Sequence, residues 1–202
     1  VKVYSEKGMP RKVGVGMFAR AFMDHFPRIP CEDDGRLRNP AIRENFIERI
    51  FSLKRWRDIA AKSPRMGELV DYHSRNKLLL LSHSQKHYRI MGKLVANEKK
   101  LPPRELFDQY EQLLLEALAH KTTAKKNQNV LLHLMGYFKK QLTPDEKQEL
   151  LEVFEQYRSG YVPLLVPLTL INHYVRKYDQ PYLKIQTYLN PHPVELKLRT
   201  SV

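Results

Sequence analysis

The 202-residue sequence predicts an all-α fold: a bundle-like domain of about eight helices, preceded by a short irregular remnant of an α/β domain. Three observations predict it. Apolar residues recur at three- and four-residue steps along most of the chain. Capping residues followed by proline mark several helix starts. A hydrophobic content of 42% with only 8 glycines is typical of a compact protein and not of a disordered one.

The most sharply marked helix starts at Thr143. Thr143 is a good N-cap, Pro144 suits the first helical position, and Glu146 is placed to close a capping box on the Thr143 amide. Gly160 follows Ser159, where a left-handed C-terminal cap is favoured. A helix is therefore expected to end at about Ser159.

The first 56 residues differ in texture from the rest and form the expected remnant. Residues 1–4 read as a short strand, 8–10 as a turn and 15–25 as a helix with phenylalanines at four-residue spacing. A loop with prolines and acidic residues follows, before Asn39 and Pro40 open a helix over about 41–61. Trp56 is expected to anchor the core. The charged residues of this helix form pairs of both signs and predict a solvated face; they are Arg43, Glu44, Glu48, Arg49, Lys54, Arg55 and Arg57.

The remaining residues, 57–202, are expected to form one helical domain. Helices are predicted over about 64–82, 85–97, 105–120, 129–142, 143–159, 164–178 and 181–189, with a lysine-rich connection at 121–126. The expected core includes Leu69, Leu80, Leu114, Leu134, Phe138, Leu151, Phe154, Leu168 and Ile171.

The composition indicates a partner class and a compartment. The net charge of +13 favours polyanionic partners such as nucleotides or RNA, although a merely solvated basic surface would have the same composition. One cysteine excludes an intrachain disulfide framework, which fits a reducing compartment. Because there is no apolar run of about 18 residues and no hydrophobic signal segment, we expect a cytoplasmic protein without membrane contact. The chain begins at Val1 within what reads as an element, so we expect a piece of a longer polypeptide.

Standard catalytic and metal-binding motifs do not match. The GVG stretch at 14–16 lacks the Lys and Ser or Thr of a phosphate-binding loop. His83 and His87 are the nearest approach to a metal-ligand pair, and no HExxH or Cys–His spacing accompanies them. Acidic neighbours are expected to suppress the thiolate of Cys31. We therefore expect no metal site.

Histidine and tyrosine side chains stand beside the apolar stripes of several predicted helices. His73 and Lys77 are four residues apart and share a helix face. Packing the stripes together is expected to bring such polar neighbours to one cleft. The candidate ligand-binding residues are Tyr72, His73, Lys77, His133, Tyr137, His173, Tyr174 and Tyr182. The alternative is that each histidine hydrogen-bonds separately within a helical core.

Four stretches in one order carry a resemblance to a known family. They are DYHSRNKLLLLSHSQKHYRIMGKLVA, NVLLHLMGYFKKQLTPDEKQELLE, YRSGYVPLLVPLTLINHYVRKY and QPYLKIQTYLNPHP. This part of the chain, about residues 57–202, resembles the YbgA-like bacterial domain of unknown function. Residues 1–56 are similar to the C-terminal end of a thiouracil desulfidase-like domain that is often fused ahead of it.

The second resemblance implies a larger enzyme that handles sulfur-modified uracil. In such domains three cysteines bind an iron–sulfur cluster, and this chain begins after all three. Cys31 lies in a loop where relatives have an aliphatic residue, so it is not expected to be a ligand. We expect no cofactor in this chain, leave its catalytic residues unassigned, and expect the upstream desulfidase-like domain as a partner.

Two functional hypotheses of different class follow, with a third kept beside them. The first is an accessory binding module that recruits a nucleobase, nucleotide or RNA, using its tyrosines as stacking groups. The second is a small-molecule enzyme that uses His73, His133 or His173 as acid or base. The third is a purely structural partner domain. The ligand and the oligomeric state stay open.

Overall fold

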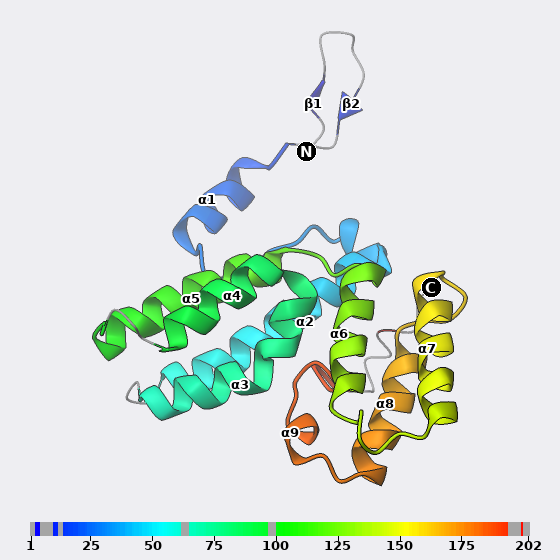
Figure 1. Ribbon diagram of the computed structural model, residues 1–202. Helices are drawn as coiled ribbons and strands as arrows, with labels where there is room; N and C mark the ends of the chain where they lie inside the picture. Colours follow the sequence, from blue (N-terminus) through cyan, green and yellow to red (C-terminus); the bar gives the residue numbers. More distant parts are fainter. Residues whose placement is uncertain are drawn as a thin grey trace.

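The computed structural model describes residues 3–4, 10–11, 14–61, 65–96, 100–193 and 199. Over these residues the protein is all-α apart from one pair of two-residue strands (Figure 1). The strands are β1 (Val3–Tyr4) and β2 (Pro10–Arg11), and a 3-10 helix covers Arg36–Arg38. The α-helices are α1 (Met17–His25), α2 (Pro40–Ala60), α3 (Met66–His83), α4 (Gln85–Ala96), α5 (Pro103–Ala119), α6 (Ala124–Gly136), α7 (Pro144–Arg158), α8 (Leu165–Lys177) and α9 (Pro181–Lys184).

The helices pack in two groups joined through α3. Helices α2, α3, α4 and α5 pack on one another in the first group, and α6, α7 and α8 pack together in the second. Helix α3 also contacts α6, and the short α9 contacts α8 below the junction of the two groups (Figure 1). None of the described helices is long and apolar enough to cross a membrane.

The helix starts follow the predicted capping signals. The Asn39 side chain accepts a hydrogen bond from the Ile42 amide at 3.2 Å. The Thr143 hydroxyl accepts from the Glu146 amide at 3.2 Å, and the Glu146 carboxylate accepts from the Thr143 amide at 2.8 Å. The predicted capping box is thus confirmed. Gly160 has φ +78, as a left-handed cap requires.

Eight of the nine predicted core residues are buried, and one is not. Leu151 is only half-buried, because the neighbouring Leu150 turns inward from α7 instead. Trp56 is 1% exposed and packs its ring on Tyr110, with centroids 4.8 Å apart, so its predicted anchoring role is confirmed.

Three predicted boundaries are corrected. Helix α6 starts at Ala124, within the stretch taken for a lysine-rich connection, because Thr123 caps the Lys126 amide at 3.3 Å. It ends at Gly136 and not near 142, since Phe138 is buried in a following turn. Helix α9 is four residues long and does not reach 189, because the Thr187 amide bonds to the Arg75 carbonyl of α3 at 2.9 Å.

The N-terminal segment stands apart from the helical body. Strands β1 and β2 pair antiparallel with Val3 opposite Arg11, so Pro10 is in a strand and not in the predicted turn; residues 8 and 9 lie outside the described part. Helix α1 has no buried residue, and Phe18 is 85% exposed. The following loop is tied to α5 by Arg28, whose Nη1 lies 2.8 Å from Glu111.

The predicted domain boundary at residue 56 falls inside α2. This helix packs against α5, and its Leu53 and Trp56 belong to the hydrophobic core that it shares with the later helices.

Candidate functional site

Two tyrosines and a lysine from three segments meet beside α3. Tyr137, in the turn after α6, stacks on Tyr182 of α9 with ring centroids 5.2 Å apart and planes at 22°. The Lys77 ammonium, from α3, lies 4.8 Å from the centroid of the Tyr182 ring. We call Lys77, Tyr137 and Tyr182 the tyrosine–lysine site.

The site is open to solvent on one side. Tyr137 is 41% exposed, while Tyr182 and Lys77 are half-buried. Burial and the neighbouring Tyr182 phenol raise the pKa of Tyr137, and burial raises the pKa of Tyr182. Both phenols therefore stay protonated at neutral pH and can donate hydrogen bonds.

Tyr88 of α4 belongs beside this site, although the sequence analysis did not single it out. Its phenol contributes to the raised pKa of both Tyr137 and Tyr182, which places it near them. The sequence carried a signal: His87 and Tyr88 are adjacent, as Tyr72 and His73 are. The same pairing rule would have found it.

His73 lies one helical turn from Lys77 on the same face of α3. Its Nδ1 is 3.1 Å from the hydroxyl of the buried Tyr110, and a Cβ on Gly92 of α4 would lie 3.9 Å from its Nε2. Burial and the nearby Lys77 charge lower the pKa of His73 to about 4. The imidazole is therefore neutral at pH 7.

Tyr72 lies in the aromatic core and not on the surface. Its hydroxyl donates to the Ser52 carbonyl at 2.9 Å, and its ring meets Trp56 edge-on, with centroids 5.3 Å apart. These contacts account for its polar and apolar parts, so Tyr72 helps to position α2 against α3.

The other candidates lie elsewhere. Tyr174 is buried between α7 and α8, where its hydroxyl donates to Glu149 at 3.3 Å and its ring stacks on Tyr178. His173 and His133 are exposed on α8 and α6. No recorded contact among the described residues joins His73, His133 and His173. The structure thus brings together Lys77, Tyr137 and Tyr182, with His73 adjacent.

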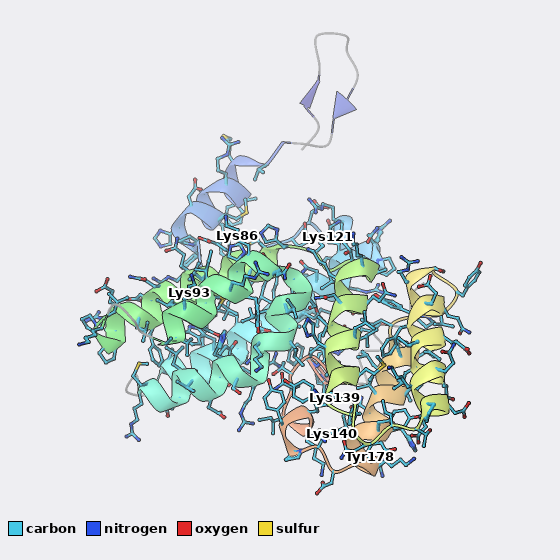
Figure 2. The ribbon with its side chains drawn as sticks, in the orientation of Figure 1. Lys86, Lys93, Lys121, Lys139, Lys140 and Tyr178 are labelled. Carbon is cyan, nitrogen blue, oxygen red and sulfur yellow. The ribbon has the colours of Figure 1, made fainter. Side chains whose placement is uncertain are left out.

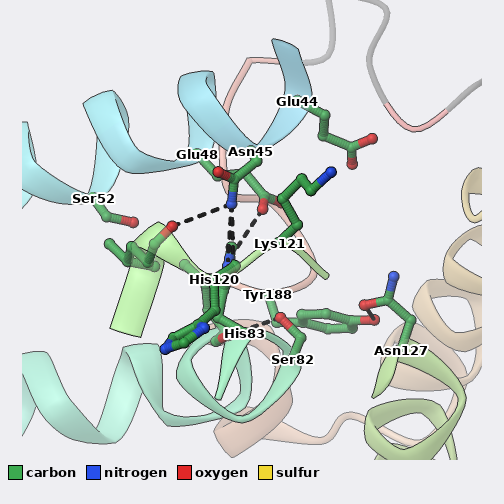
Figure 3. Close-up of polar contacts among 12 residues, drawn as sticks. Glu44, Asn45, Glu48, Ser52, Ser82, His83, His120, Lys121, Asn127 and Tyr188 are labelled. Carbon is green, nitrogen blue, oxygen red and sulfur yellow. Dashed lines mark hydrogen bonds and ion pairs between the residues drawn. The ribbon is translucent and has the colours of Figure 1, made fainter. Parts of the chain in front are cut away.

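A buried ionic network was missed (Figure 3). Glu48 of α2, predicted to be solvated, is 2% exposed. Its carboxylate lies 2.6 Å from Arg199 Nη2 and 3.1 Å from His83 Nε2. Against the effect of burial, these two partners hold the pKa of Glu48 at about 2. Glu44, also predicted to be solvated, is largely buried 3.2 Å from Arg199 Nε; burial and the Glu48 charge raise its pKa to about 7.

The network continues toward α6 and α7. Arg199 Nη1 donates to the Tyr188 carbonyl at 2.6 Å, and the Tyr188 hydroxyl donates to Asn127 at 3.1 Å. Asn127 in turn donates to the Tyr157 hydroxyl at 2.9 Å. Because its members bond to one another inside the protein, the network is suited to holding the helix groups together.

Metal binding has no support from the geometry. No group of three or more His, Cys, Asp or Glu side chains in the described ranges is placed to hold a metal ion.

Fold and site define an all-α module with a partly exposed aromatic and cationic surface. The chain belongs to the family described as "Protein of unknown function (DUF1722)", which matches residues 77–193 and so spans the whole tyrosine–lysine site. It is 36% identical over 159 residues to the protein from Escherichia coli (strain K12) named "Uncharacterized protein YbgA"; the match covers 78% of this chain and 94% of that protein. No solved structure shows a significant match.

Proposed function

We propose that this chain is an accessory binding module that holds a nucleobase of a nucleotide or RNA at the tyrosine–lysine site. The observation that carries the proposal is the stacked pair of Tyr137 and Tyr182, with the Lys77 ammonium over the Tyr182 ring. Tyr137 offers a ring that is 41% exposed and is already held in place by Tyr182. A preorganised ring loses little freedom when a ligand stacks on it.

The chemistry suits a nucleobase that carries phosphate. An aromatic face stacks on any base, and such stacking is worth about 1–3 kcal/mol per base when judged by alanine substitution. The Lys77 charge adds attraction for an anionic ligand. The protonated phenols of Tyr137 and Tyr182 are donors that could reach the carbonyl groups of a pyrimidine.

The surroundings add positive charge without close carboxylate partners. Lys139 and Lys140 follow Tyr137 in the same turn and are exposed (Figure 2). Neither forms an ion pair within the described part of the chain. Together with a net charge of +13, these lysines support binding of a phosphate backbone, which releases counterions.

The proposal extends to the segment before the helical domain. If residues 1–56 end a desulfidase-like domain, the module would recruit a sulfur-modified uracil for that domain. The support is the sequence resemblance alone. The enzymatic alternative has less support, because the three histidines it would use do not meet and His73 is a weak base.

Short single-stranded RNA tests the proposal. Tyr137→Ala should weaken binding of an oligouridine by about tenfold, as loss of one stacked base predicts. Lys77→Gln should also weaken binding and reduce its dependence on salt concentration. Tyr161→Ala is the matched control, because Tyr161 is 81% exposed in the loop after α7 and should leave the affinity unchanged.

Fluorescence anisotropy measures the affinity, and thermal unfolding checks that each variant is folded. Wild-type affinity in folded Tyr137→Ala would contradict the proposal. Equal losses in Tyr137→Ala and Tyr161→Ala would also contradict it, because they would show unspecific binding.

A further inference from the structure

Four helix ends meet on the far side of α3 from the tyrosine–lysine site. His83, the last residue of α3, donates from Nδ1 to the His120 carbonyl at 2.7 Å, directly after α5 (Figure 3). Lys126, in the first turn of α6, donates to the carbonyl oxygens of His83 at 2.7 Å and Lys121 at 2.9 Å. These bonds hold the segment that connects α5 to α6 against the start of α4.

Basic side chains gather on this surface. Lys86 of α4, His120 and Lys121 are exposed, and Figure 2 shows Lys86 and Lys121 at the same end of the molecule. The His120 ring lies 5.3 Å from the ring of His87. We call Lys86, His120 and Lys121 the lysine–histidine site.

The charges of this site are not neutralised by the protein. The inner histidines have carboxylate partners, since His83 lies 3.1 Å from Glu48 and His87 lies 3.5 Å from Glu116. Lys86, His120 and Lys121 form no ion pair within the described part of the chain. Burial and the positive groups around it, among them His87, Lys126 and Lys86, lower the pKa of His120. Bringing these groups together therefore costs electrostatic free energy that an anion would recover.

Backbone dipoles add to the same field. The N-terminal ends of α4 and α6 both lie at this surface, where the Ser84 and Thr123 hydroxyls accept from the His87 and Lys126 amides at 3.4 and 3.3 Å. Helix N-termini carry partial positive charge, which favours an anion nearby.

We propose that the lysine–histidine site binds a phosphate group, with Lys86, Lys121 and protonated His120 as direct donors and Lys126 as a positioning residue. Lys126 already donates to two carbonyl oxygens, so it fixes the loop that carries His120 and Lys121. The phosphate belongs either to a small phosphate monoester or to the backbone of an RNA. The site is separate from the tyrosine–lysine site and does not depend on it.

Binding of phosphate should raise the pKa of His120, because an anion beside the imidazole stabilises its protonated form. The His120 ring proton is followed by NMR from pH 5 to 8 in the full chain, with His120→Gln to assign the signal. Inorganic phosphate should raise this pKa by about 1 unit relative to chloride at equal ionic strength. An unchanged pKa at saturating phosphate would overturn the proposal.

A pair of charge-matched variants separates a site from general attraction. Lys86→Gln with Lys121→Gln should weaken phosphate binding by at least about tenfold. Lys93→Gln with Lys147→Gln removes the same charge from exposed positions on α4 and α7 and should have little effect. Equal losses in both variants would overturn the proposal.

Two ligands distinguish the sources of the phosphate, and one variant separates this proposal from the preceding one. A nucleoside monophosphate that shifts His120 supports a monoester, and a short RNA without terminal phosphates that shifts it supports the backbone. Tyr137→Ala should leave the His120 response to inorganic phosphate unchanged. If that response disappears in folded Tyr137→Ala, the two sites are not separate and the present proposal fails.

Discussion

The guanidinium of Arg199 carries a full charge into the protein interior, where Glu48 and Glu44 face it and Tyr188 covers it. The guanidinium carbon lies 5.1 Å from the centroid of the Tyr188 ring. A buried charge is tolerated only when it is paired and hydrogen-bonded, as it is here. The residue thus links α2 to the segment that follows α9.

Arg199→Met should destabilise the protein by about 3–5 kcal/mol, because it leaves Glu48 buried with His83 alone as its charged partner. Urea unfolding followed by circular dichroism measures this loss. Arg158→Met is the matched control, since Arg158 pairs with Glu155 on the exposed face of α7 and its removal should have no measurable effect. Equal effects of the two substitutions would show that the network contributes nothing special.

His73 should make stability depend on pH. Its pKa is about 4 in the folded protein and about 6.5 when unfolded, so the unfolded chain binds the proton first. The stability contributed by neutral His73 is therefore complete above pH 6.5 and lost as pH falls toward 4. His73→Gln keeps a polar group near Tyr110 but cannot titrate.

The measurement for His73 is the difference in unfolding free energy between wild type and His73→Gln. This difference should be constant above pH 6.5 and should move against the wild type between pH 6.5 and 4. A difference that stays flat across this interval would contradict the assignment.

The network could not be predicted from the sequence, because its partners are far apart along the chain. Glu48 and Arg199 are separated by 151 positions. Charged residues at i,i+4 spacing on a helix normally indicate a solvated face, and nothing local marked Glu44 and Glu48 as exceptions. Their burial follows from how α2 packs.

At the scale of elements, local signals predicted helix starts better than helix ends. Asn39 and Thr143 were correct because an N-cap acts on its own first turn. The ends of α6 and α9 were wrong because tertiary contacts decide them. Phe138 is buried in a turn, and Gln186 donates to the Ser74 carbonyl of α3 at 3.0 Å instead of continuing α9.

Helix α1 should be the first element to yield to protease. None of its residues is buried, and its phenylalanines contact one another more than the body, with Phe22 and Phe26 centroids 5.0 Å apart. Such a segment opens at little free-energy cost. Limited proteolysis with mass spectrometry should find early cleavage before Asn39 and later cleavage in α3 to α8. Equal resistance of α1 and α7 would contradict this expectation.

At the scale of the molecule, periodicity and capping were sufficient to predict an all-α protein with most of its core. They were also sufficient to place Lys77, Tyr137 and Tyr182 in a candidate set. They could not select these three from eight, because the selection depends on the angle at which α3, α6 and α9 meet. His133 and His173 share the local pattern of His73 but face solvent.

The tyrosine–lysine site lies where both helix groups and α9 come together, so its geometry reports on the whole fold. Lys77 comes from the first group, Tyr137 follows a helix of the second, and Tyr182 lies on α9 (Figure 1). Changes that loosen the packing of α3 on α6 are therefore expected to affect ligand binding as well as stability.

Intermolecular nuclear Overhauser effects between a bound oligouridine and the tyrosine rings test the central claim most directly. The Tyr137 signals are assigned by comparison with Tyr137→Phe. Our account predicts contacts from the uracil H5 and H6 protons to the ring protons of Tyr137 in the saturated complex. Contacts to other tyrosines such as Tyr161, without any to Tyr137, would contradict it.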